Sequence, residues 1–306
     1  MGRNTEIIAK GCTKMEFISR EDTPLTDDEW KVVDEKVLDA ARASLGGRRF
    51  LSLAGPLGAG TVSIPIERPR FEKAAISLSG ESREPAIDAV ERRELPIPVI
   101  SCDFRLEWRD LERVRRQELP FDASRAAVAA LQVARAEDHL VFFGNEAMGI
   151  PGLLNCSGCS KAPLGDWSQP GQGYKAVSGA VERLLSNGYP GPFTLVVSPR
   201  GFAGLNRVLE GTPLLELDRV ENLIGSKVLV SPALGSGLSS DQAISEGSRI
   251  SDKAVLLWSR PEAVDLVIGQ DITTVYLEST GMVHFFRVLE SVVLRIKLPD
   301  AICVIE

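Results

Sequence analysis

The sequence contains very little histidine: His139 and His284 are the two histidines in 306 residues. Histidine is the side chain that most often acts as a general base or a metal ligand near neutral pH. Two histidines far apart in the sequence leave little material for a histidine-based active site. The composition therefore favours a non-catalytic role, although it does not name that role.

Positive charge, cysteine and long apolar runs are also scarce. Lys and Arg number 35 against 42 Asp and Glu, a net charge of −7, whereas nucleic-acid binders are usually basic. No apolar run approaches the roughly 18 residues that a membrane helix needs, and residues 1–14 lack the features of a signal peptide. We therefore expect a cytoplasmic protein without nucleic-acid or membrane partners. Five cysteines in a reducing compartment do not predict a disulfide framework.

The hydrophobic and charged shares, 44% and 25%, are those of a globular protein with a buried core. Thr26 and Glu29 form the Thr-x-x-Glu pattern of a capping box, which predicts the start of a helix. Apolar residues follow at helical spacing as far as Leu45, and Gly46-Gly47 end the helix. A short alternating strand is predicted next, over residues 48–53.

Two long elements and an arm are predicted further along the chain. An alanine-rich helix over about residues 122–143 would be roughly 30 Å long. Residues 284–297 contain neither Gly nor Pro, and as one strand they would extend about 46 Å, longer than a usual strand. Residues 61–82 have few large apolar side chains, which predicts a projecting hairpin. Such elements suggest an extended molecule built to contact neighbours.

Two motifs could carry chemistry. Cys156 and Cys159 form a CxxC pattern, but a zinc site needs two more ligands at suitable spacing, and a redox CxxC normally opens a helix. Since this pair lies in a Gly/Ser-rich loop, a structural or incidental interpretation is favoured over redox or metal chemistry, and no metal site is predicted. Glu137-Asp138-His139 has no nucleophile beside it, so we interpret it as a solvated or interface face.

Several short segments occur in an order and spacing typical of one family. From about Met15 to Glu306 the chain resembles the encapsulins, bacterial nanocompartment shell proteins also called linocin-like proteins. The segments that carry the resemblance are Met15-Glu16-Phe17, Pro24-Leu25-Thr26 with Trp30, Leu45 to Phe50, Gly55 to Gly58, Phe104 to Arg116, Gly191-Pro192-Phe193, Gln270-Asp271 and Pro299-Asp300-Ala301-Ile302. Residues 164–167, 286–290 and 294–297 resemble a myxobacterial-type branch.

The resemblance implies an α+β fold of the Hong Kong 97 phage major-capsid type. The implied parts are a leader (1–14), an N-terminal helix with the start of a peripheral domain (15–54), an extended arm or E-loop (55–82), the peripheral domain with a spine helix (83–148), an axial domain (149–264), and a return through the peripheral domain to the C-terminus (265–306).

The resemblance also implies a function. Encapsulins assemble into closed icosahedral shells and are not enzymes. The shells enclose cargo enzymes that serve iron storage or oxidative-stress defence, such as ferritin-like proteins or peroxidases. Cargo binds the inner wall through a C-terminal targeting peptide. By position, Arg48, Phe50, Asp271 and Ile272 match the docking surface, and Ser52 replaces an acidic residue of some members. An apolar groove with flanking charges suits a short peptide.

Two further sites follow from the resemblance. Glu210, Gly211 and Thr212 fall at the five-fold pore loop, where a ring of Glu210 carboxylates would favour cations, although an ordinary surface loop is the alternative. Some members bind flavin at a tryptophan close to the position of Trp108. In an ungapped alignment, Trp108 lies one position before that tryptophan. Apart from that flavin, no cofactor is expected.

Two alternative functions remain at this point. A prophage major capsid protein would share the fold, but such proteins usually carry a long N-terminal scaffolding segment, and a short leader precedes the first helix here. A thiol or flavin redox protein would use Cys156 and Cys159.

Overall fold

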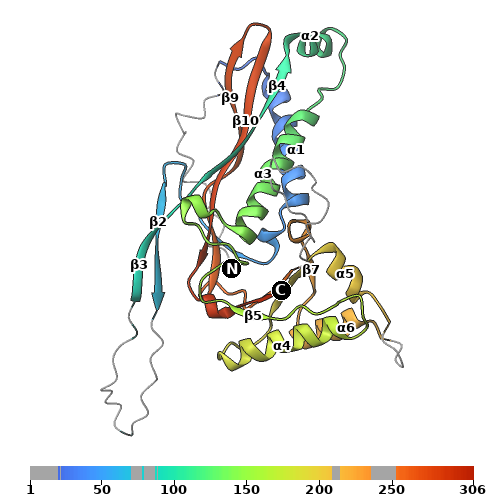
Figure 1. Ribbon diagram of the computed structural model, residues 1–306. Coiled ribbons are helices and arrows are strands. Elements are labelled where there is room, and N and C mark those ends of the chain that lie inside the picture. The colour runs from blue at the N-terminus through green and yellow to red at the C-terminus, as the bar shows by residue number, and fades with distance from the viewer. Residues whose placement is uncertain are drawn as a thin grey trace, which may run out of the picture. The chain divides into compact units, whose positions relative to one another are not determined.

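The computed structural model (Figure 1) describes residues 20, 22–69, 78, 87, 89–208, 214–235 and 253–306. Its helices are α1 (Asp27–Ser44), α2 (Trp108–Arg116), α3 (Ser124–Phe143), α4 (Gln172–Ser186), α5 (Pro199–Leu205) and α6 (Glu216–Ile224). Its strands are β1 (Ser52–Ala54), β2 (Ser63–Pro69), β3 (Ala89–Pro96), β4 (Val99–Glu107), β5 (Ser160–Ala162), β6 (Thr194–Val197), β7 (Leu229–Val230), β8 (Ala254–Leu257), β9 (Val264–Thr280), β10 (Val283–Ile296) and β11 (Ile302–Ile305).

Two compact units make up the chain. The first comprises Met1–Arg42, Ser101–Gln132 and Ile272–Leu289, and the second comprises Ala43–Ile100, Val133–Asp271 and Glu290–Glu306. Within the described residues, no helix combines the length and the apolar character needed to cross a bilayer.

Among the described residues, the strands form three sheets, in the orders β1-β9-β10-β4, β5-β11-β8-β6-β7 and β2-β3. β9 and β10 have 17 and 14 residues, and β10 confirms the long strand predicted at 284–297. The 20-residue helix α3 confirms the one predicted at about 122–143. β11 pairs with β5 and β8, so the end of the chain joins the sheet formed by the segment predicted as the axial domain.

In the first unit, the predicted capping box begins α1. The Thr26 amide donates to Glu29 Oε2 at 2.8 Å, and the Glu29 amide donates to Thr26 Oγ1 at 3.3 Å. A cluster of three aromatic rings then packs the apolar face of the helix against strands. The Trp30 ring meets Phe286 of β10 edge-on at 5.7 Å, and Phe104 of β4 stacks on Phe286 at 5.2 Å. The helix is therefore held by both its cap and its packing.

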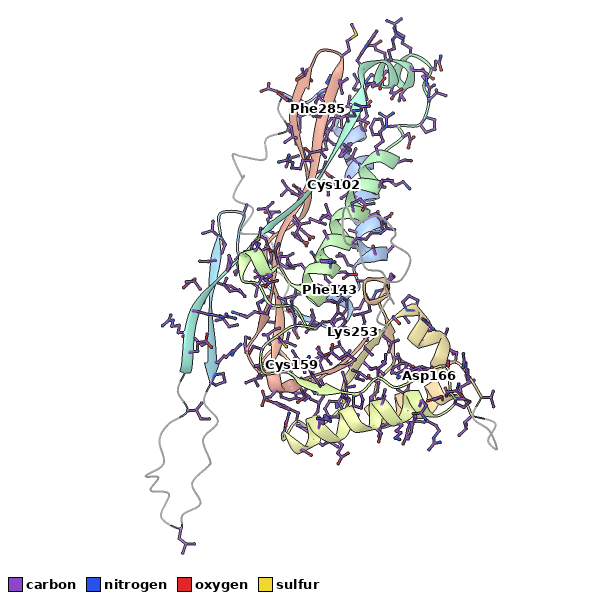
Figure 2. The ribbon with its side chains drawn as sticks, viewed as in Figure 1. Cys102, Phe143, Cys159, Asp166, Lys253 and Phe285 are labelled. Carbon is purple, nitrogen blue, oxygen red and sulfur yellow. The ribbon has the colours of Figure 1, made fainter. Side chains whose placement is uncertain are left out.

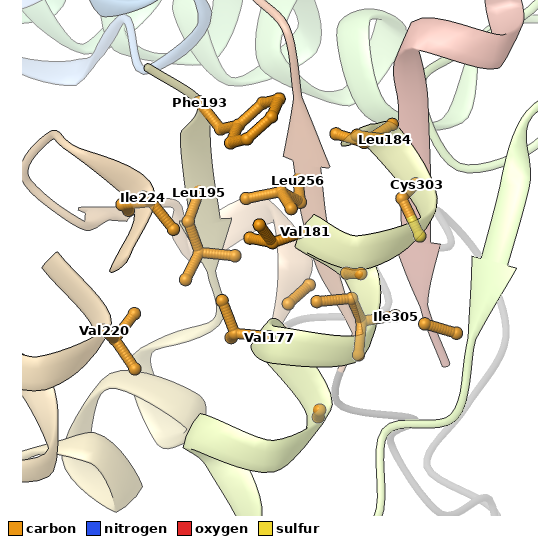
Figure 3. Packing of buried hydrophobic residues seen from close by; sticks show 14 of the residues in the cluster. Val177, Val181, Leu184, Phe193, Leu195, Val220, Ile224, Leu256, Cys303 and Ile305 are labelled. Atoms are coloured by element: carbon orange, nitrogen blue, oxygen red, sulfur yellow. The ribbon is translucent and has the colours of Figure 1, made fainter. Parts of the chain in front are cut away.

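In the second unit, α4 covers one face of the five-stranded sheet (Figure 3). Its apolar side chains recur at helical spacing and contact β8 and β11, whose residues are all buried. The cluster includes Val177, Val181, Leu184, Leu195, Leu256, Cys303 and Ile305.

Two local predictions were wrong in detail. Residues 48–53 were expected as one strand, but Gly47–Arg49 form a short 3₁₀ turn and β1 begins at Ser52. The turn forms because a distant carboxylate binds its amides, as described below.

β2 and β3 pair in antiparallel register from Ser63 opposite Pro96, so the ribbon extends well beyond residue 82, the predicted end of the arm. The charged sequence of β3 hid its strand character.

Candidate functional site

The side chain of Arg48 lies at the centre of a cluster of carboxyl groups in the second unit. Its Nε and Nη2 atoms donate to Glu137 Oε2 of α3 at 2.9 and 2.7 Å, and Nη2 also donates to Glu290 Oε2 of β10 at 2.6 Å. Its Nη1 donates to Asp271 Oδ1 of β9 at 2.7 Å. The guanidinium presents five N–H donors in a fixed fork, so one side chain can join three elements.

This cluster has a buried inner part and an exposed outer part. The side chains of Glu137 and Glu290 are 0% exposed and that of Arg48 is 14% exposed, whereas Asp271 is 55% exposed. Buried ions persist only where partners and hydrogen bonds offset the loss of hydration. Glu137 and Glu290 therefore hold Arg48 in place, and Asp271 is the member of the cluster that reaches solvent.

Burial and charge set the protonation of the cluster. Burial, and next the negative charge of Glu137, hold the pKa of Glu290 well above its usual range, against the opposing effect of Arg48. Burial lowers the pKa of Arg48, but its hydrogen bonds to Glu137 and Asp271 outweigh burial and raise it. Arg48 thus stays charged, and Glu290 is the carboxyl that retains a proton most readily.

A second carboxylate, Asp138, binds the backbone next to Arg48. Its Oδ1 accepts hydrogen bonds from the amides of Gly46 at 3.0 Å and Gly47 at 2.8 Å. A Cβ at Gly46 would lie 2.9 Å from Asp138 Oδ2, so a side chain there would displace this carboxylate. Burial raises the pKa of Asp138 to about 6, although the two amides act in the opposite direction.

These contacts correct the interpretation of Glu137-Asp138-His139 as a solvated or interface face. Both carboxyls are buried and hold the turn after α1, while His139 stacks on Phe143 at 4.8 Å. Sequence reasoning missed the partners of Arg48, although a signal was present. Glu137 occurs at helical spacing among the buried positions of α3, and Glu290 lies in the same alternating phase of β10 as the buried Val288 and Val292.

The structure brings together some of the predicted docking residues. Arg48 and Asp271 form an ion pair, and the half-buried Phe50 packs on Phe142 with ring centroids 6.3 Å apart. Ser52, however, pairs with Asp265 in β9, six positions or about 20 Å before Asp271. Ile272 follows Asp271 in β9, is buried, and belongs to the first unit.

The other predicted sites are less defined by the structure. Trp108 is the first residue of α2, is 37% exposed, and has the Arg109 guanidinium 5.8 Å from its ring; flavin binding there stays a prediction. Glu210, Gly211 and Thr212 lie outside the described residues. In the part of the chain that is described, no three His, Cys, Asp or Glu side chains are grouped to hold a metal ion.

Replacing Arg48 by methionine should destabilise the chain strongly. Glu137 and Glu290 would remain buried without their cation, which costs about 3–5 kcal/mol in the free energy of unfolding. Urea unfolding followed by tryptophan fluorescence measures the loss. The control is the triple variant Arg48→Met, Glu137→Gln, Glu290→Gln, which should recover part of the stability because it removes the unpaired charges. Equal unfolding midpoints for the single and triple variants would contradict this assignment.

The raised pKa of Asp138 predicts a pH dependence with a defined sign. The carboxyl titrates at 3.8 when unfolded and at about 6 when folded, so the folded chain binds more protons between these values. Ionised Asp138 therefore opposes folding above about pH 6, and this cost disappears as the pH falls towards 3.8. As the pH falls from about 7 to about 5, the natural chain should gain stability relative to the Asp138→Asn variant. A pH-independent difference between their urea midpoints would refute this linkage.

Comparison with known proteins identifies the family. The family model described as "Encapsulating protein for peroxidase" matches residues 15–239. The chain is 36% identical over 292 residues to the type 1 encapsulin shell protein EncA of Myxococcus xanthus, covering 95% of this chain and 96% of EncA. It is 38% identical over 283 residues to a diheme-cytochrome–encapsulin shell fusion protein of Kuenenia stuttgartiensis, covering 92% of this chain and 74% of the fusion.

Solved structures confirm the predicted capsid fold. The virus-like particle of Pyrococcus furiosus superposes with a TM-score of 0.70 at 22% identity, over 90% of this chain and 99% of that one. The capsid protein of Myoviridae phage XM1 gives a TM-score of 0.63 at 13% identity, over 86% and 91% of the two chains. Fold and sequence therefore agree, and the chain belongs to the encapsulin family of shell proteins.

Proposed function

We propose that this chain is a structural, non-catalytic subunit that assembles with copies of itself into a closed icosahedral shell in the cytoplasm and encloses a cargo enzyme. The observation that carries the proposal is the match to a shell protein over 95% of this chain and 96% of the relative. The fold shared with a virus-like particle supports the same function. Contacts that repeat around several symmetry axes close into a shell when their angles fit.

Exposed apolar side chains in the second unit support assembly. Val62, just before β2, is 77% exposed, Val99 at the start of β4 is 64% exposed, and Leu57 is 51% exposed. Large apolar side chains that are exposed in a single subunit can be covered by neighbouring chains. Neighbouring subunits are the partners that would cover these side chains in a shell.

Cargo docking is assigned to the exposed edge of the Arg48 cluster. Arg48 is fixed by two buried carboxyls, so it holds Asp271 in one orientation at the surface. Asp271 can then pair with a positive group of the cargo's C-terminal targeting peptide, while the half-buried Phe50 supplies apolar surface. Ile272 is buried, so it is left out of this docking surface. Ser52 pairs with Asp265, about 20 Å from Asp271 along β9, so it would contact only a peptide that extends along this strand. The cargo is a ferritin-like protein or a peroxidase; the cytochrome fusion of the Kuenenia relative supports redox or iron chemistry inside the shell.

The pore and flavin assignments rest on position within the family. Glu210, Gly211 and Thr212 are proposed to line the five-fold pore, where a ring of carboxylates would attract cations. Trp108 is the candidate for a flavin contact, with Arg109 beside its ring.

Assembly is tested on the protein produced alone, by size-exclusion chromatography and negative-stain electron microscopy. We expect uniform closed particles on the order of tens of nanometres across, because the subunit carries its own interfaces. A monomer or a small oligomer at the same concentration would overturn the shell assignment.

Docking is tested by Asp271→Asn in shells produced together with a cargo protein that ends in the targeting peptide. Loss of the exposed charge should lower the amount of cargo per shell roughly tenfold, equivalent to about 1.4 kcal/mol, while assembly continues. Asp103→Asn is the matched control, since Asp103 is 47% exposed and also pairs with an arginine, Arg287. Phe50→Ala is less specific because Phe50 also packs on Phe142. Equal loading of the two Asn variants would exclude Asp271 from docking.

A further inference from the structure

The CxxC segment forms a β-turn immediately before β5. The Cys159 amide donates to the Cys156 carbonyl at 3.5 Å, with Ser157 and Gly158 between them. Gly158 has a φ of 90°, the left-handed conformation that a type II turn requires at this position. Such a turn brings its first and last Cα atoms within about 7 Å, and a disulfide spans about 4.4–6.8 Å. The turn therefore holds the two cysteines at a separation suited to a disulfide.

Both thiols donate to backbone carbonyls. Cys159 Sγ donates to the Cys156 carbonyl at 2.9 Å, and Cys156 Sγ donates to the Leu153 carbonyl at 3.8 Å. The neighbouring Cys156 thiol, and next the charge of Lys161, lower the pKa of Cys159 to about 7. The neighbouring Cys159 thiol, together with burial, raises the pKa of Cys156. Cys159 is therefore the partner that ionises near neutral pH.

The cysteine with the lower pKa is also the more exposed of the two. Cys156 is buried, at 5% exposure, whereas Cys159 (Figure 2) is half-buried. A third cysteine, Cys303, lies in β11 opposite Ser160, but burial raises its pKa to about 11. The accessible thiolate is thus Cys159, and its nearest protonated partner along the turn is Cys156.

We propose that Cys156 and Cys159 form a reversible dithiol–disulfide site on the shell subunit that reacts with a hydroperoxide. The Cys159 thiolate attacks one oxygen of hydrogen peroxide, the O–O bond breaks, and hydroxide leaves and takes up the proton that Cys159 released. The Cys156 thiol then attacks the sulfur of the Cys159 sulfenic acid, the S–O bond breaks, and water leaves. Two thiols are oxidised to one disulfide while one peroxide is reduced to two waters.

This site revises the interpretation of the CxxC as structural or incidental. Redox CxxC motifs normally lower a thiol pKa with the start of a helix. Here the turn brings the Cys156 thiol next to Cys159 and the flanking strand supplies Lys161, so no helix is needed. The proposal is independent of shell assembly, since its residues belong to one turn of one chain.

Peptide mass spectrometry tests the proposal on the reduced full chain after treatment with hydrogen peroxide and alkylation. We expect the peptide that contains both cysteines to escape alkylation and to weigh about 2 Da less than its unalkylated dithiol form. A thiol reductant should restore the dithiol. Cys156→Ser should leave a sulfenic acid on Cys159 that dimedone labels, and Cys159→Ser should slow oxidation of this segment at least about tenfold. Cys102→Ser is the matched control and should react like the natural chain, because Cys102 is also half-buried but burial raises its pKa.

Four results would overturn the proposal. They are the absence of a disulfide, a disulfide from Cys159 to Cys303, a disulfide between subunits, and oxidation of Cys102 as fast as that of Cys159. If a variant does not fold, the natural chain still gives a test. Its Cys159 should be alkylated by iodoacetamide with a half-maximal rate near pH 7, and a rate no faster than that of Cys102 would contradict the assignment.

Discussion

The buried contact between Arg48 and the carboxyls of Glu137 and Glu290 is the constraint on which the second unit depends. Two carboxyl groups without access to water persist only where a cation and hydrogen bonds offset the loss of hydration, and here one guanidinium donates to both. The contact joins the turn after α1 to α3 and β10. Asp138 holds the same turn through the amides of Gly46 and Gly47, so the chain is fixed there by side-chain and backbone contacts together.

This constraint positions two features further along the chain. Because the turn is fixed, β1 enters the sheet at a defined point, with Ser52 opposite Asp265 of β9. Because Arg48 is fixed, Asp271 is presented at the surface on a rigid partner instead of a mobile side chain. The inner carboxyls thus act on structure, and the outer one reaches solvent. In the proposed docking role, this division would let cargo bind without rearranging the subunit.

The sequence predicted the elements whose signals are local. The capping box of Thr26 and Glu29 predicted α1, and the lack of Gly and Pro over residues 284–297 predicted β10. It could not predict the Arg48 cluster, because the partners of Arg48 lie 89 and 242 positions away. The buried spacing of Glu137 and Glu290 was visible, but a charged residue on an apolar face is interpretable only when its partner is known. β3 was missed for a related reason, since its charged side chains hide the alternation that marks a strand.

The most direct test of this account is a three-dimensional reconstruction, by cryo-electron microscopy, of particles loaded with a cargo protein. The account predicts a closed icosahedral shell in which the Arg48–Asp271 pair lies on the inner wall, with density for the cargo peptide beside Asp271. An open assembly, or a closed shell with this pair on its outer surface, would contradict it.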